Sequence, residues 1–225
     1  SLPETRSGAL AAAARAQITE LSERADAIVV GPGLLESRAT SRMLATWLAQ
    51  LHDVPVVIDA AALGAFDDDG GRIASGRAQR IITPHAGEAA RLVGCERSEI
   101  ESRPLELGIE MARRFRAVCV MKGATTYIID GEALLRGESG AIASNDYGNV
   151  GLATSGSGDT LSGIIGGLAA RGASPFHAAA WGVYLHAAAA DALAHRQGGP
   201  LGFLARELLD EIPRLMQSGA VDASR

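Results

Sequence analysis

Residues 151–172, GLATSGSGDTLSGIIGGLAARG, hold seven glycines and a single acidic side chain, Asp159. So much glycine is unusual for a plain helix, and the apolar residues after Asp159 are unusual for a simple turn. Small residues let the main chain approach an anion closely, and free N–H groups at the start of the following helix would point toward it. This stretch therefore predicts an anion-binding loop, with Gly156 and Gly158, at the beginning of a helix.

Asp159 follows this loop directly and is expected in the first turn of the helix. An ionised carboxylate there can accept a proton from a hydroxyl that attacks a phosphoryl group, while the N–H groups of Gly156 and Gly158 stabilise the transferred charge. The plain structural interpretation is that Asp159 only caps the helix and that the glycines allow tight packing. The other loops at strand ends favour the catalytic interpretation.

Helices and short apolar strands alternate along most of the chain. Apolar runs predict four buried strands, at 26–31, 55–60, 80–84 and 117–123. Apolar residues at helical spacing predict helices between these strands and, later in the chain, at about 176–195 and 204–215. Strands that are apolar on both faces and separated by helices are typical of a parallel sheet covered on both sides.

The pattern changes after Gly123. Three segments joined by short glycine-bearing turns predict antiparallel strands at one edge, over 125–131, 132–137 and 141–144. The expected fold is therefore a three-layer α/β/α arrangement with a mainly parallel central sheet and antiparallel edge strands.

The composition limits the possible functions. With 225 residues, of which 47% are hydrophobic and 21% charged, the chain is expected to form one domain with a sizeable core. A net charge of −5 with interspersed basic residues argues against a nucleic-acid surface. No apolar run reaches the roughly 18 residues of a membrane span, and no charged-then-apolar leader opens the chain. Cys95 and Cys119 lack CxxC spacing, which favours reduced thiols and a soluble, cytoplasmic protein.

Ligands of an open parallel sheet bind beyond the carboxyl ends of its strands. One short segment follows each predicted strand: GPG (31–33), DAAAL (59–63), TPHAGE (83–88) and KGATT (122–126). We expect these segments to converge on one crevice together with SGSGD (155–159).

Three of the motifs, TPHAGEAARLVG, MKGATT and GLATSGSGDTLSGIIGGLAARG, resemble in order and separation the ADP- or ATP-dependent NAD(P)H-hydrate dehydratases of the ribokinase-like superfamily. The resemblance runs from about Leu2 to Leu215. It implies a ribokinase-like fold of the type found as the C-terminal domain of bifunctional NAD(P)H-hydrate repair enzymes. It also implies a hydro-lyase that phosphorylates the hydroxyl of hydrated NADH or NADPH (NADHX or NADPHX) and eliminates phosphate. ADP or ATP would be the co-substrate, Mg²⁺ the metal, and a homo-oligomer, such as a tetramer, the assembly.

The resemblance implies roles for individual residues. Asp159 matches the catalytic base, assisted by Gly156 and Gly158, and it contacts the hydrate together with Gly31, Gly33 and His85. Glu88 matches a glutamate through which related kinases position Mg²⁺. The residues implied to bind the nucleotide are Lys122, Gly123, Ala124, Thr125, Thr126, Asn149, Gly151, Thr154, Ser155, Gly156, Ser157 and Gly158.

Plainer interpretations exist for three of these side chains. Lys122 could be the solvated end of a strand, His85 an ordinary turn residue behind Pro84, and Glu88 a helix cap.

The chain departs from the family pattern at several positions. Leu35 stands where GPGLG has its last glycine, Ala61 replaces the second aspartate of DADAL, and Val150 replaces a common proline. Family members carry a further strand, a glycine-rich loop and a helix before the segment that matches LPETRSGAL. We therefore expect residues 1–225 to form a single ribokinase-like domain without this N-terminal strand and loop. Either those residues lie outside the 225 of this chain or the protein lacks them.

Two other functions are compatible with the same residues. A small-molecule kinase of the superfamily, of the hydroxymethylpyrimidine or hydroxyethylthiazole type, would share the loop and the base. A nucleotide-binding module without turnover would account for the missing carboxylate at position 61. PHAGE together with GLATSGSGD favours the dehydratase.

The remaining histidines and tryptophans are expected to have structural roles. His177, His186 and His195 are nine residues apart, about 180° per step on a helix, so they cannot form one metal-binding face. We interpret them as packing or surface residues. Trp47 and Trp181 are expected in the core or at a subunit interface.

Overall fold

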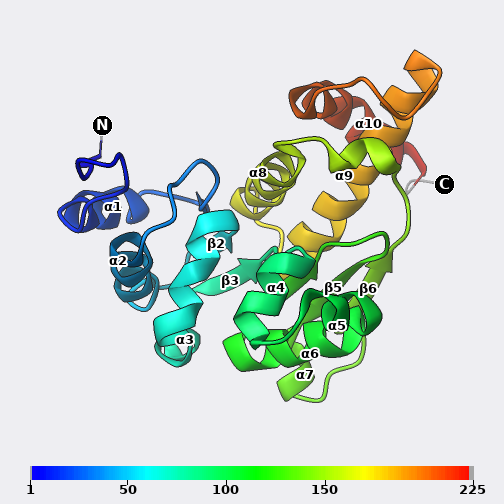
Figure 1. Ribbon diagram of the computed structural model, residues 1–225. Coiled ribbons are helices and arrows are strands. Elements are labelled where there is room, and N and C mark those ends of the chain that lie inside the picture. Colours follow the sequence, from blue (N-terminus) through cyan, green and yellow to red (C-terminus); the bar gives the residue numbers. More distant parts are fainter. Residues whose placement is uncertain (1, 223–225) are drawn as a thin grey trace.

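A mainly parallel sheet forms the centre of the computed structural model, which describes residues 2–222 and all their side chains except 68, 69 and 218–222 (Figure 1). In this part of the chain the sheet has six strands in the order β1-β2-β3-β4-β5-β6. The strands are β1 (Ile28–Val30), β2 (Pro55–Ile58), β3 (Gln79–Ile82), β4 (Val118–Met121), β5 (Thr126–Asp130) and β6 (Ile142–Asn145). Strands β1 to β4 pair in parallel, whereas β5 is antiparallel to both β4 and β6. The predicted mainly parallel sheet with antiparallel edge strands is confirmed.

Helices cover both faces of this sheet. The α-helices are α1 (Ala14–Ser22), α2 (Arg38–Leu48), α3 (Ala65–Ser75), α4 (Ala86–Val93), α5 (Arg97–Ser102), α6 (Pro104–Phe115), α7 (Gly131–Leu135), α8 (Ser157–Ala170), α9 (Pro175–Gln197) and α10 (Leu208–Asp222). Three short 3₁₀ turns are η1 (Ala60–Gly64), η2 (Val150–Ala153) and η3 (Ala205–Glu207). Helices α2, α3, α4 and α6 pack on one face, and α8 and α9 pack on the other (Figure 1). The predicted three-layer architecture is therefore confirmed.

Alternation of side chains along the strands builds two separate core layers. In β2, Val56 and Ile58 join the cluster that contains Trp47, whereas Val57 joins the cluster that contains Val183 of α9. Every residue of β4 is buried. This double burial explains why the strands are apolar throughout rather than at alternate positions. Trp47 lies in the core, as predicted.

The prediction of a strand at 132–137 is wrong, because most of this segment, EALLRG, lies in helix α7. Asp130 caps this helix: its side chain accepts a hydrogen bond of 3.0 Å from the N–H of Ala133. Glu, Ala and Leu also favour helix over strand. The antiparallel pairing of β5 therefore continues directly to β6, with α7 between them in sequence.

Helices α3 and α5 lie outside the predicted series. The sequence of α3, AFDDDGGRIAS, includes two adjacent glycines that weaken a helical pattern. Phe66 and Ile73 of α3 are nonetheless fully buried. Packing against the core, rather than local propensity, therefore stabilises this helix.

Both cysteines are free thiols. Cys119 lies in the core, where burial raises the pKa of its thiol to about 12, so it stays protonated. Within residues 2–222, no helix combines the length and the apolar character that crossing a membrane requires.

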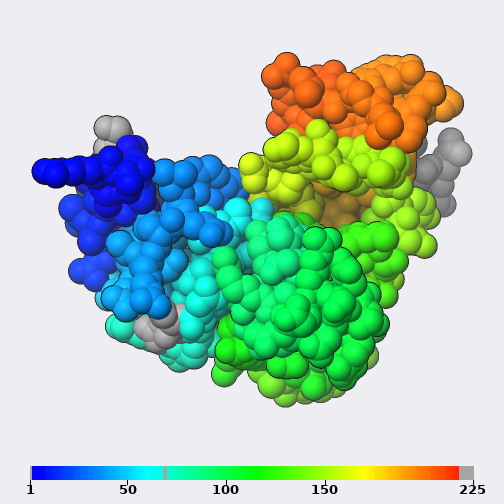
Figure 2. Space-filling model, in the orientation of Figure 1, coloured from blue at the N-terminus to red at the C-terminus, as the bar shows by residue number. Residues whose placement is uncertain are grey.

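A hollow marks the surface near the carboxyl ends of the parallel strands. Figure 2 shows it between the yellow-to-orange part of the chain, which contains α8 and α9, and the green part below. The loops that follow β2, β3 and β4 lie on this side of the sheet.

Candidate active site

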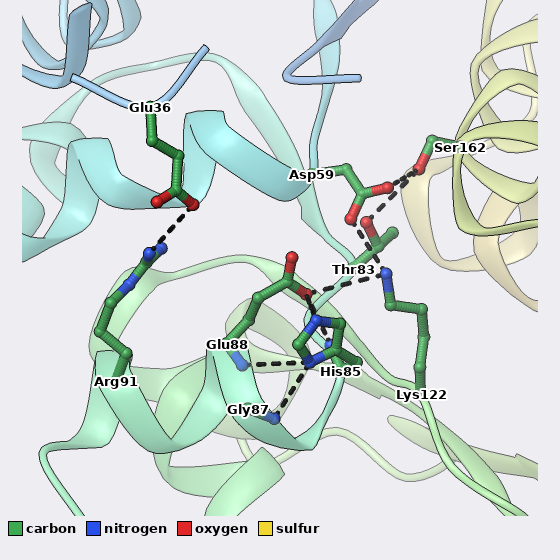
Figure 3. Close-up of polar contacts among 9 residues, drawn as sticks. All are labelled: Glu36, Asp59, Thr83, His85, Gly87, Glu88, Arg91, Lys122 and Ser162. Atoms are coloured by element: carbon green, nitrogen blue, oxygen red, sulfur yellow. Dashed lines mark hydrogen bonds and ion pairs between the residues drawn. The ribbon is translucent and has the colours of Figure 1, made fainter. Parts of the chain in front are cut away.

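The carboxyl ends of β2, β3 and β4 bring three of the predicted segments together (Figure 3). Thr83, after β3, donates its N–H to the carbonyl of Ile58 at 3.3 Å, and Lys122, after β4, donates its N–H to the carbonyl of Pro84 at 2.9 Å. His85 and Lys122 form an isolated parallel bridge. The DAAAL, TPHAGE and KGATT segments therefore meet at one edge of the sheet, as the strand-end argument predicts.

A buried carboxylate lies at the centre of this meeting point. Asp59 is only 2% exposed. Its Oδ1 lies 3.0 Å from Nζ of Lys122, and its Oδ2 accepts a hydrogen bond of 2.7 Å from Oγ of Ser162 on α8 (Figure 3). Asp59 therefore links the end of β2 to both β4 and α8.

The glycine-rich loop faces the same lysine. Gly156 adopts a left-handed conformation (φ 82°) and precedes α8, which begins at Ser157. A Cβ added to Gly158 would lie 3.4 Å from Nζ of Lys122 and 3.9 Å from Oδ2 of Asp59. The first turn of α8 and the ammonium group therefore lie side by side, an arrangement that suits a bound anion.

A cavity of about 770 Å³ opens beside this loop. Its walls come from the segments after β3, β4 and β6, from the start of α8, and from one face of α9. Among its described lining residues, Lys122 is the only lysine or arginine, and none is an aspartate or glutamate. A cavity of this size, with one cation and no acidic wall, suits a ligand that carries phosphate.

Many residues implied by the resemblance line this cavity. Seven of the predicted nucleotide-binding residues do so: Lys122, Gly123, Ala124, Thr126, Asn149, Ser157 and Gly158. His85, predicted to contact the substrate, lines it as well. The roles of these residues toward ligands stay predictions.

The other predicted nucleotide-binding residues lie outside the cavity walls; they are Thr125, Gly151, Thr154, Ser155 and Gly156. At Gly151 the requirement for glycine comes from packing, because a Cβ there would lie 2.1 Å from the carbonyl oxygen of Pro200. Asn149 also has a structural contact, since its Nδ2 donates to Asp191 at 2.9 Å.

Asp159 occupies the first turn of α8, directly after Gly158. Its side chain is exposed, and Asp159 is not among the residues that line the large cavity. An exposed carboxylate beside the loop is accessible to a substrate that approaches from solvent. Its catalytic role stays a prediction.

His85 and Glu88 form a capping box at the start of α4. Nδ1 of His85 accepts hydrogen bonds from the N–H groups of Gly87 (3.0 Å) and Glu88 (3.2 Å), and Oε2 of Glu88 accepts one from the N–H of His85 (2.8 Å). The same Oε2 lies 3.8 Å from Nζ of Lys122. Glu88 is therefore both a helix cap and a second carboxylate near the lysine.

The glycines of GPG lie after β1 and differ in their surroundings. A Cβ on Gly31 (φ 122°) would overlap the carbonyl oxygen of Asp59 at 1.7 Å. The main chain of the protein thus fills the space that a side chain at Gly31 would need. Gly33 has no atom within 4 Å of such a Cβ and borders open space. Neither glycine lines the large cavity.

The three departures from the family pattern lie in different surroundings. Leu35 is exposed, and Val150 is exposed at the rim of the large cavity. Ala61 is buried and lines a separate polar pocket of about 310 Å³ that also contains Arg91. Arg91 forms an ion pair there with Glu36 (3.4 Å; Figure 3). It forms a second one with Asp67 (3.5 Å).

His186 has a larger role than the packing or surface role that we predicted. It lines the large cavity, and its Nε2 lies 3.0 Å from Oγ of Ser157. Burial lowers the pKa of His186 to about 4, and the charge of Lys122 acts in the same direction. The imidazole is therefore neutral near pH 7 and holds the first residue of α8.

Sequence reasoning missed Asp59, Ser162 and His186. A signal existed for Asp59, because it is the first polar residue after the buried strand β2. Ser162 and His186 lie within helices whose sequence patterns are those of packing faces. Only the packing of α8 and α9 against the strand ends brings them to the site.

The sheet order, the glycine loop at the start of α8 and the strand-end site define a ribokinase-like protein, and solved structures of this class share the fold. The sequence model of the NAD(P)H-hydrate dehydratase family matches residues 2–214. The chain belongs to this family.

Individual relatives agree with this membership. A bifunctional NAD(P)H-hydrate repair enzyme of Moorella thermoacetica is 40% identical over 220 residues, which cover 97% of this chain and 39% of the relative. An ADP-dependent (S)-NAD(P)H-hydrate dehydratase of Xanthomonas campestris is 39% identical over 191 residues, which cover 85% of this chain and 61% of the relative. This chain thus spans less than two thirds of the length of either relative.

A solved structure is similar over most of the chain. The ADP/ATP-dependent NAD(P)H-hydrate dehydratase from Bacillus subtilis, co-crystallised with ATP/Mg²⁺, matches with a TM-score of 0.72 at 31% identity. The match covers 89% of this chain and 69% of the Bacillus chain.

Proposed function

We propose that this protein is an ADP- or ATP-dependent NAD(P)H-hydrate dehydratase, which converts NADHX and NADPHX back to NADH and NADPH. The observation that carries the proposal is the position of Gly158, at the start of α8, next to Lys122 at a cavity without acidic walls. Membership of the dehydratase family supports the hydrate as substrate. Similarity to a dehydratase co-crystallised with ATP/Mg²⁺ supports an adenine nucleotide as co-substrate.

The proposed reaction has two stages. Asp159 removes the proton from the hydroxyl of the hydrate as that oxygen attacks the terminal phosphoryl group, and the nucleotide leaves as AMP or ADP. Lys122 and the N–H groups at the start of α8 balance the charge on the transferred group. Loss of phosphate from the ester, together with a ring proton, then restores the double bond of the dihydronicotinamide.

Mg²⁺ is the metal of the proposal, and Glu88 is the residue that would help to hold it. One oxygen of Glu88, Oε2, accepts the N–H of His85, which leaves Oε1 for a metal or its water. Among the described residues no group of three His, Cys, Asp or Glu side chains could hold a metal. Phosphate oxygens and water molecules would therefore supply most of the ligands, which is usual for Mg²⁺. When bound, the ion would neutralise phosphate charge.

The test is direct. The protein is incubated with NADHX, Mg²⁺ and either ADP or ATP, and recovery of NADH absorbance is followed. We expect recovery only when the nucleotide is present. A kinase of the hydroxymethylpyrimidine or hydroxyethylthiazole type would consume ATP only with its own alcohol, and a binding module would show neither reaction. Either of these results would refute the proposal.

We also propose that the protein forms a homo-oligomer in the cytoplasm. Tyr147, Trp181 and Tyr184 are 66%, 52% and 43% exposed and contact one another edge to face, with ring centroids 6.1 and 5.8 Å apart. Exposed aromatic clusters are typical of protein interfaces, and this supports the assembly. The two free cysteines favour a reducing compartment. That residues 1–225 form a single domain stays a prediction.

A further inference from the structure

We propose that Asp59 is a positioning residue: its buried carboxylate, held by Ser162, fixes the ammonium of Lys122 against the start of α8. The inference deepens the proposed function, on which it rests, because it concerns the phosphate end of the same site. It assigns a task to a residue that sequence analysis did not include among the site residues.

Each oxygen of Asp59 has a polar partner. Oδ1 lies 3.0 Å from Nζ of Lys122, and Oδ2 accepts the Oγ–H of Ser162 at 2.7 Å. Oγ of Ser162 lies 3.5 Å from Oγ1 of Thr83, so the serine is itself surrounded by polar groups. With the carboxylate 2% exposed, its orientation is fixed from three elements, β2, β4 and α8.

The chemistry of Lys122 requires a partner that holds its ammonium group. Lys122 is the only lysine in the 225 residues, although the chain has 21 lysine and arginine residues in total. An ammonium is a compact charge on a flexible four-carbon stem, so it needs a partner to hold one position. Arginine occupies every other basic position, which is consistent with a requirement for a small point charge at this one.

The contact with Asp59 places Nζ of Lys122 beside the first turn of α8. Nζ lies 3.4 Å from where a Cβ of Gly158 would be, so the glycine allows the ammonium to approach the first turn of α8. The competing partner is Glu88, whose Oε2 is 3.8 Å from the same nitrogen. Without the charge of Asp59, the ammonium is free to move toward Glu88 and away from the loop.

This arrangement has an unusual consequence for binding and turnover. Asp59 partly neutralises Lys122, so it weakens the attraction of the lysine for phosphate while fixing its direction. Positioning contributes mainly in the transition state. Asp59→Asn should therefore lower kcat by about 10- to 100-fold while the Kd for ADP or ATP stays unchanged or becomes tighter.

The experiment compares Asp59→Asn with Asp130→Asn, a control that removes the same charge at the other end of the sheet, where Asp130 pairs in register with Val118. The dehydration rate, the nucleotide Kd by calorimetry and the apparent Mg²⁺ requirement are measured for each. Asp59→Asn is then combined with Lys122→Met. Because Asp59 acts through the lysine, we expect less than a twofold further loss of kcat in the Lys122→Met background.

A second readout does not depend on turnover. Isotope-labelled lysine gives one set of side-chain NMR signals in this protein, because Lys122 is the sole lysine. We expect the two Hε protons to be resolved in the wild type and in Asp130→Asn, and to merge in Asp59→Asn as the side chain becomes mobile. Ser162→Ala should produce a smaller change in the same direction.

Three results would overturn the inference. They are an unchanged lysine signal in Asp59→Asn, a rise in nucleotide Kd that matches the loss of kcat, and a shifted Mg²⁺ requirement, which would assign Asp59 to the metal. If the wild type fails to convert NADHX, the proposed function fails. The lysine signal and the nucleotide Kd still decide the role of Asp59 in that case.

Discussion

Two pairs of single side chains set the geometry of the candidate site. Lys122 is held by Asp59 at 3.0 Å, and Ser157 is held by His186 at 3.0 Å. One pair orients a cation and the other orients the first residue of α8. Between them they position the two sources of positive potential that a phosphate would meet.

Asp159→Asn tests the proposed base. The amide cannot accept the proton of the hydrate hydroxyl, so we expect turnover to fall by at least about 100-fold. Nucleotide affinity should change little. Asp26→Asn, which also removes one exposed carboxylate, is the control and should keep full activity. Comparable rates for the parent and Asp159→Asn would remove Asp159 from the mechanism.

His186 makes the stability of the protein depend on pH. Its pKa is about 4 in the folded state and 6.5 when exposed, so between these values the unfolded state binds more protons. The stabilisation is complete above pH 6.5 and is lost as the pH falls toward 4. At roughly 1.4 kcal/mol per pKa unit, the loss is at most about 3.5 kcal/mol.

His186→Gln keeps a hydrogen-bonding partner for Ser157 but cannot titrate. Urea unfolding at pH 7 and pH 5 should therefore show a smaller difference for this variant than for the wild type. His177→Gln, an exposed histidine on the same helix, should leave the difference unchanged. An equal pH dependence in all three proteins would contradict a neutral, buried His186.

At the scale of elements, the loop after β1 and the end of β2 lie unusually close together. Gly31 has φ 122° and the carbonyl of Asp59 fills the space beside it, whereas Gly33 has φ 73° with open space around it. Alanine substitutions at these two glycines therefore distinguish two costs. At Gly31 the new side chain would meet steric overlap, whereas at Gly33 it would meet only the strain of a left-handed conformation. The overlap also connects Gly31 to the residue that holds Lys122.

Gly31→Ala should destabilise the protein by about 3 kcal/mol or more, because the overlap at 1.7 Å forces the main chain of Asp59 to move. Gly33→Ala should cost only about 1–2 kcal/mol, the strain of a left-handed residue. Denaturant unfolding measures both. Equal losses would show that the contact with Asp59 contributes nothing.

At the scale of the whole molecule, two surface features with different properties lie next to each other. The carboxyl ends of the parallel strands carry the proposed phosphate site. The exposed aromatic cluster of Tyr147, Trp181 and Tyr184 adjoins it, because Tyr147 also lines the large cavity. Assembly through this cluster would therefore bring a second copy close to the cavity rim.

Trp181→Arg should shift the protein toward monomer in sedimentation velocity, because a charge replaces apolar area at the proposed interface. Leu135→Arg, at an equally exposed apolar residue on α7, is the control and should leave the assembly intact. A wild type that sediments as a monomer would refute the proposed oligomer, and an unaffected Trp181→Arg would place the interface elsewhere.

The sequence alone determined the layers, the parallel strands, the glycine loop and the positions of Lys122 and Asp159, because strand periodicity and glycine spacing are local signals. The strand prediction failed at 132–137, although two local signals, the cap at Asp130 and the helix-forming Glu, Ala and Leu, favour helix α7. Tertiary structure decided the pairs that orient the site, since Asp59 and Lys122 are 63 residues apart and Ser157 and His186 are 29 apart. Such contacts form only when strand ends and helices from distant parts of the chain pack together, and no local pattern encodes that packing.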